Sequence, residues 1–152
     1  RLFFRLWDPH HKNQREEIEK VQKRAARFVT GNYKMETGNT QINLNSLEWP
    51  KLEERRLQTK LNIFQKARLK LIDIPTDHLN FKSRPTRQVG EGQTYQQNFS
   101  KVDSHIFSFY PHTTHLWNHL PLEVRLERDI EVFTSKVNEI DLLSIKQKMS
   151  VK

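Results

Sequence analysis

The chain has 152 residues, about one domain's length, with 35% hydrophobic residues, below the usual globular share. The absence of cysteine excludes disulfides and cysteine-based zinc sites. No stretch reaches the roughly 18 apolar residues that span a membrane, and no signal peptide is visible, so we expect an intracellular protein without membrane contact. Because the first residue is Arg1 and not Met, we expect a piece of a longer protein.

The net charge of +8 is concentrated in the first half of the chain. Through Thr76 there are 16 Lys and Arg against 9 Asp and Glu, a net +7, and the remainder adds +1. Basic segments of this kind attract phosphate backbones, which favours a nucleic-acid partner. The alternative is a solvated helix surface that happens to carry excess Lys and Arg.

Residues 11–30 have the pattern of an amphipathic helix that ends at Gly31. The residues expected on its apolar face are Ile18, Val21, Ala25, Phe28 and Val29. Residues 32–45 are polar and predict a loop. Ser46 then offers an N-cap for a long helix with Pro50 in its first turn, which runs to about Lys70. Its helically spaced positions are Leu52, Leu57, Leu61, Phe64 and Ala67 or Arg68.

The second half predicts shorter elements. Residues 77–92 are expected to form an exposed basic loop, and residues 93–99 and 105–110 alternate enough for a short β-hairpin. A helix is expected to start at Pro111 and to stop at Pro121. Asp129 should cap a last helix, whose apolar face is formed by Ile130, Phe133, Val137 and Ile140. Residues 147–152 should fray as a tail. The fold expected is therefore mainly α, organised as 1–76, 77–92, 93–146 and 147–152.

No group of residues has the pattern of a catalytic site. The aspartates are dispersed, the adjacent pairs Glu16-Glu17 and Glu53-Glu54 point in different directions on a helix, and no nucleophile elbow or phosphate-binding loop occurs. One group of histidines has the spacing of a metal site. His112, His115 and His119 share a helix face, but Leu116, Trp117 and Leu120 compete for the buried side. We therefore expect no metal or cofactor in this segment.

Three basic clusters are the candidate nucleic-acid contacts, and they would position a phosphate backbone without reading its sequence. They comprise Lys20, Lys23, Arg24 and Arg27; Arg55, Arg56 and Lys60; and Lys82, Arg84 and Arg87. Arg55 and Arg56 follow two glutamates, so a structural ion pair is an equal alternative for them. Tyr95 and Phe99 could stack on bases near the third cluster, although a place in the core is favoured for both.

Several short motifs occur in order along the chain. Residues 108–121 read SFYPHTTHLWNHLP and resemble the S-F-[FY]-P-x-T-x-x-x-W-N-x-L-P signature of non-LTR, LINE-type retrotransposon reverse transcriptases. Residues 6–9 (LWDP), 19–29 (EKVQKRAARFV) and 47–56 (LEWPKLEERR) resemble further motifs of that family. So do Ile74-Pro75 with Thr86-Arg87, and residues 133–137. The residues that carry this signature most clearly are Trp7, Trp49, Phe109, Pro111, Trp117, Asn118 and Pro121.

The resemblance implies the region that follows the polymerase palm, with residues 1–76 thumb-like. The family's catalytic aspartates, which would bind Mg²⁺, would lie upstream and have no counterpart here. Expected partners are the RNA template or an RNA–DNA hybrid and the upstream palm domain of the parent chain, and a nuclear location fits that role. The alternative is a stand-alone or relic helical module that binds a protein. The sequence leaves the oligomeric state open.

Overall fold

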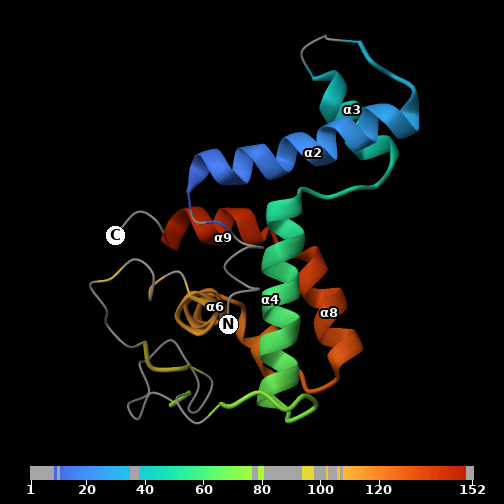
Figure 1. The fold of residues 1–152 in the computed structure, drawn as a ribbon. Coiled ribbons are helices and arrows are strands. Elements are labelled where there is room, and N and C mark those ends of the chain that lie inside the picture. The colour runs from blue at the N-terminus through green and yellow to red at the C-terminus, as the bar shows by residue number, and fades with distance from the viewer. Residues whose placement is uncertain are drawn as a thin grey trace. The chain divides into compact units, whose positions relative to one another are not determined.

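The structure, a computed structural model, describes residues 9, 11–34, 38–76, 79–80, 94–97, 102, 106 and 108–149. These residues form seven helices and no β-strand, so the mainly α prediction is confirmed. The chain divides into two compact units, residues 1–56 and residues 57–152, and the helix α4 (Leu52–Arg68) contains the boundary. Figure 1 shows the elements of each unit along the chain.

The first unit is built on α2 (Lys12–Thr30) and α3 (Asn39–Ser46). The bounds of α2 match the prediction, and Gly31 follows it in the left-handed conformation with φ 64°. The face predicted for burial was wrong. α2 buries Gln22 and Ala26, whereas Val21 and Phe28 are exposed. Burial follows the neighbours that α2 meets, since the Gln22 amide donates to the Pro50 carbonyl at 2.9 Å.

The predicted loop at residues 32–45 contains α3, and that prediction was wrong. α3 has little apolar character of its own, with the sequence NTQINLNS. Three asparagine side chains compensate for this. The Asn32 amide donates to the carboxamide oxygens of Asn39 (2.7 Å) and Asn43 (3.1 Å), and the Asn43 amide donates to the Asn32 carbonyl at 3.1 Å. Buried polar groups that are satisfied in this way fix one packing arrangement.

The start of α4 also differs from the prediction, because Ser46 is the last residue of α3 and not the N-cap of α4. One N–H group in the first turn of α4 is accepted by a residue from a distant part of the sequence. The Glu19 carboxylate on α2 accepts the Glu53 N–H at 2.9 Å. A negative charge at a helix N-terminus is favoured by the helix dipole. In addition, Arg15 forms an ion pair with Glu53 at 2.8 Å.

The second unit contains the principal core. The remainder of α4 contributes Leu57, Leu61, Phe64 and Ala67, which confirms the predicted buried positions. Around it lie α6 (Phe109–Asn118), α7 (Leu122–Leu126), α8 (Ile130–Glu139) and α9 (Leu142–Met149). In Figure 1, α8 runs beside α4, and the Thr134 hydroxyl donates to the Asn62 side-chain oxygen at 3.1 Å between them.

α8 has the predicted cap and face. The Asp129 carboxylate accepts the N–H groups of Glu131 (2.8 Å) and Val132 (3.1 Å). Phe133 and Val137 are fully buried one helical turn apart. The helices α7 and α9 were not predicted, and α9 extends to Met149, into the predicted tail.

The signature run forms α6, although the helix begins at Phe109, two residues before Pro111. Pro111 still lies in the first turn, where its missing N–H has no helical partner to lose. After α6 ends at Asn118, Pro121 occupies the N-cap position of α7. The predicted second hairpin strand was wrong at its end, because Phe109 and Tyr110 are helical. Among the remaining hairpin residues, 94–97, 106 and 108 are described and form no strand, and Ile106 is helical, whereas 93, 98, 99, 105 and 107 lie outside the described ranges.

Candidate nucleic-acid interface

The basic residues of α2 divide into an exposed group and a packed one. Lys20, Lys23 and Arg24 are exposed, on a helix that buries Gln22 and Ala26. The segment 20–30 has four basic residues and no acidic one. The second half of α2 therefore presents a local excess of positive charge, which a phosphate backbone would recognise.

The exposed cations of α2 have at most weak ion pairs, so they can bind another anion. The Lys20 ammonium lies 2.6 Å from the Glu17 carboxylate, with both side chains more than half exposed. The hydrogen bond from Lys20 and its charge, together with the charge of Arg24, lower the pKa of Glu17. Exposed pairs of this kind contribute little stability and exchange readily for another partner. Lys23 forms no ion pair with any described residue.

Arg27 has a structural role instead. It is half-buried, and its guanidinium donates to the Thr40 hydroxyl at 3.2 Å. This bond links α2 to α3. Arg27 thus belongs to the packing of the first unit, and we leave it out of the exposed group.

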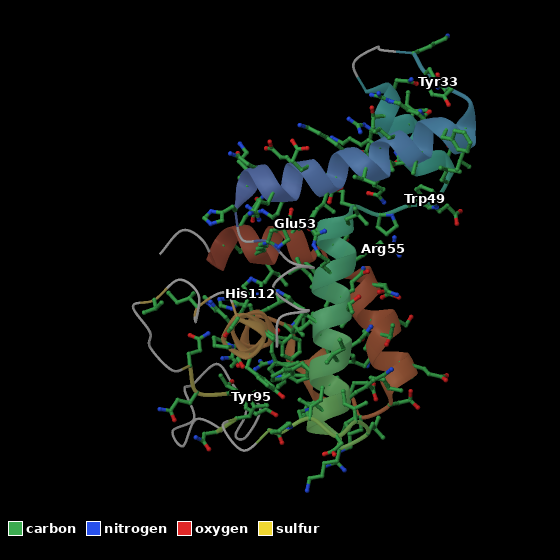
Figure 2. All side chains as sticks on the ribbon, viewed as in Figure 1. Tyr33, Trp49, Glu53, Arg55, Tyr95 and His112 are labelled. Atoms are coloured by element: carbon green, nitrogen blue, oxygen red, sulfur yellow. The ribbon has the colours of Figure 1, made fainter. Side chains whose placement is uncertain are left out.

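The second cluster, on α4, does not form one surface. Arg55 is exposed and Arg56 half-buried, while Lys60 is only 5% exposed. The Lys60 Nζ lies 3.5 Å from Nδ1 of His112, which Figure 2 labels on α6. A side chain this deeply buried has no free approach to a phosphate backbone, so Arg55 is the member of this cluster that is placed for such contact.

The third cluster, Lys82, Arg84 and Arg87, lies outside the described residues, as does Phe99. Tyr95 is described and is 3% exposed. Its ring meets Phe64 edge-on, with centroids 5.4 Å apart, and lies 6.4 Å from Trp117. Burial raises the pKa of its hydroxyl. Tyr95 is therefore a core residue, the alternative that the sequence favoured over base stacking.

The signature residues also serve the packing. Trp117 is fully buried and Phe109 packs against the core, while Trp49 in the first unit is half-buried. Trp7 lies outside the described ranges. The Arg68 guanidinium carbon lies 5.1 Å from the centroid of the Trp117 ring, a cation–π contact.

His112 and His115 lie on α6 and His119 is its C-cap, and the rings of His115 and His119 lie together with centroids 4.8 Å apart. His112 is buried beside Lys60, whereas Nδ1 of the exposed His119 lies 2.8 Å from the carbonyl oxygen of His115. Within the described ranges, no group of three or more His, Asp or Glu side chains could hold a metal ion. None of the described helices is long and apolar enough to cross a membrane.

Sequence reasoning missed two features of this region. Periodicity grouped the apolar residues of α2 correctly but assigned them to the wrong environment. It also gave no sign that Glu19 contacts the start of α4, because a contact between positions 34 residues apart has no local signal. Comparison with protein-family models, with curated proteins and with solved structures gave no match.

Proposed function

We propose that this chain is the non-catalytic C-terminal segment of a LINE-type RNA-directed DNA polymerase, and that α2 helps to hold the RNA template or the RNA–DNA hybrid. The ordered motifs quoted above support the family. The observation that carries the binding role is the exposed trio Lys20, Lys23 and Arg24 on a helix segment without an acidic residue.

The mode of binding follows from the chemistry of the trio. Lysine and arginine on a helix surface contact phosphates through charge, without reading bases. Each phosphate that they neutralise releases bound counterions, so the affinity falls steeply as salt rises. Arg55 is a further exposed cation in the set, and Lys82, Arg84 and Arg87 remain predicted contacts.

The test is a salt series of RNA binding, measured by fluorescence anisotropy on a labelled single strand and on an RNA–DNA hybrid. The trio is replaced by Lys20→Gln, Lys23→Gln and Arg24→Gln together. The matched control removes the same charge from exposed positions outside the candidate set, Lys66→Gln, Arg128→Gln and Lys148→Gln.

The trio variant should weaken binding and lower the salt slope for the single strand by about 2, since each contact contributes about 0.7. The control should bind close to wild type. If both variants lost RNA affinity equally, the effect would be one of net charge alone. If the trio variant kept wild-type RNA affinity, α2 would not be part of the interface. The family assignment has its own test, which is to sequence the transcript upstream of Arg1 for an open frame with an aromatic-x-Asp-Asp motif.

A further inference from the structure

Among the described residues of the first unit, more large hydrophobic residues are exposed than buried. Among its described residues, Ala26 and Leu44 are the buried hydrophobic residues apart from Pro9. Its exposed large hydrophobic residues are Val21, Phe28, Val29, Tyr33 and Ile42, and Figure 2 labels Tyr33. Contiguous exposed apolar surface is a mark of an interaction site in a soluble protein.

Three of the exposed side chains form a continuous stripe on α2. Val21, Ala25 and Phe28 follow one another at i, i+4 and i+7, so they lie on one face of the helix. Val21 is 64% and Phe28 78% exposed. Val29 is also exposed, next to Phe28 in sequence. We call Val21, Ala25 and Phe28 the α2 stripe.

One edge of the α2 stripe is cationic. Lys20 and Arg24 each precede a stripe residue by one position, which places both of them about 100° round the helix on the same side. Both are exposed. Glu17 is also exposed, four residues before Val21, and lies 2.6 Å from the Lys20 ammonium. The surface is therefore apolar along its length, and the border formed by Glu17, Lys20 and Arg24 has a net charge of +1.

We propose that the α2 stripe binds an acidic amphipathic helix presented by another protein. Such a helix would place apolar residues at i, i+3 or i+4 and i+7 on the stripe, in the helix-against-helix mode of peptide recognition. Its carboxylates would lie along Lys20 and Arg24. Charge complementarity of this kind steers the encounter and fixes the orientation.

The same charges disfavour other occupants. A second copy of this chain would bring its own Lys20 and Arg24 to the interface, and like charges repel. A nucleic-acid backbone would satisfy the basic edge but would leave Val21 uncovered. Val21 and Phe28 have no part in the nucleic-acid role, whereas Lys20 and Arg24 are shared by the two proposals, so a variant of Val21 and Phe28 distinguishes them.

The probe is a fluorescein-labelled synthetic peptide of about five helical turns, roughly 18 residues, with leucine at i, i+3, i+4 and i+7 and glutamate on the flanks. A second peptide keeps the leucines and carries lysine on the flanks. Anisotropy titrations with the whole chain should show saturable binding of the glutamate peptide and at least about tenfold weaker binding of the lysine peptide.

Variants then locate the site. Val21→Ser with Phe28→Ser should weaken the glutamate peptide by about tenfold or more, as loss of central apolar anchors does at interfaces. The control is Leu126→Ser with Val132→Ser, two exposed apolar residues of the second unit, which should leave affinity unchanged. All four side chains are exposed, and unchanged circular dichroism would confirm that each variant is folded.

Four results would overturn the proposal. Equal affinity for both peptides would show that the flanking charges are not recognised. Unchanged affinity of the stripe variant for the glutamate peptide would show that the peptide does not bind at the α2 stripe. A concentration-dependent dimer in sedimentation that Phe28→Ser abolishes would assign the stripe to a second copy. Loss of RNA binding in the stripe variant would assign the α2 stripe to nucleic acid. If the trio variant binds RNA like wild type while the glutamate peptide still binds, the nucleic-acid proposal fails and this proposal stays in place.

Discussion

The side chain of Asn118 pairs with both backbone groups of Tyr95. Its carboxamide oxygen accepts the Tyr95 N–H at 3.0 Å, and its amide donates to the Tyr95 carbonyl at 2.9 Å. The Asn118 carboxamide thus satisfies both backbone hydrogen-bonding groups of Tyr95. Because Tyr95 is buried against Phe64 and Trp117, this pairing fixes an irregular segment onto the end of α6.

Replacing Asn118 should therefore destabilise the second unit. Asn118→Ala leaves both Tyr95 groups without this partner and should cost about 1–3 kcal/mol, the penalty for unsatisfied buried polar groups. Asn118→Asp keeps the acceptor but sets a carboxylate against the Tyr95 carbonyl, so it should also destabilise. Urea unfolding gives the free energy, with Asn138→Ala on the exposed side of α8 as control. Equal effects of Asn118→Ala and Asn138→Ala would contradict the role assigned to the pairing.

Trp117 is the centre of the aromatic core and has the largest fully buried side chain. Its ring stacks on Phe133 with centroids 5.7 Å apart and lies 5.2 Å from Phe64. Trp117→Ala should cost about 3–5 kcal/mol, since it removes a large buried group and leaves a cavity. Trp117→Phe should cost less and should remove the most blue-shifted tryptophan emission. Trp49→Phe, at a half-buried position, is the control and should leave that emission in place.

Local patterns were reliable where a helix depends on its own sequence. α8 has an N-cap carboxylate at Asp129 and buried residues at Phe133 and Val137, and both follow from spacing and capping chemistry. The buried positions of α4 were predictable for the same reason, because Leu57, Leu61 and Phe64 recur at helical intervals and α4 has the core on one side.

Non-local contacts account for the failures. The Glu19 carboxylate accepts the Glu53 N–H in the first turn of α4, and α3 is held by bonds from Asn32. For α2, periodicity identifies which apolar residues share a face, but which face is buried depends on what packs against it. The sequence grouped Arg27 with the trio Lys20, Lys23 and Arg24, and Lys60 with Arg55 and Arg56. The structure separates Arg27 and Lys60 from their clusters, because Arg27 bonds to Thr40 and Lys60 is buried beside His112.

Glu127 should make stability depend on pH. The Lys136 ammonium at 2.8 Å, followed by the Asp129 and Arg128 N–H groups, lowers the pKa of Glu127 below its ordinary value of 4.5. The unfolded chain therefore binds this proton more readily than the folded chain does. The contribution of Glu127 is fully present above about pH 5 and is lost as the pH falls through the folded pKa.

Glu127→Gln should flatten the dependence of unfolding free energy on pH below about pH 5, because it removes the group whose proton affinity changes on folding. Denaturant titrations at a series of pH values measure this slope. Glu139→Gln, an exposed position at the end of α8, is the matched control. If the unfolding free energy of Glu127→Gln depended on pH as in wild type, Lys136 would not be paired with the Glu127 carboxylate in the folded chain.

Gly31 allows α2 to end where it does. Its φ of 64° lies in the left-handed region, and a Cβ built at this position meets no atom within 4 Å. The cost of a side chain at position 31 therefore comes from the backbone conformation and not from a clash with neighbouring atoms. Gly31→Ala should destabilise the first unit by about 1–2 kcal/mol, whereas Gly31→Asn should cost less because asparagine tolerates this conformation. Thermal unfolding followed by circular dichroism compares the two variants, and a Gly31→Ala protein as stable as wild type would mean that α2 does not end in a left-handed residue.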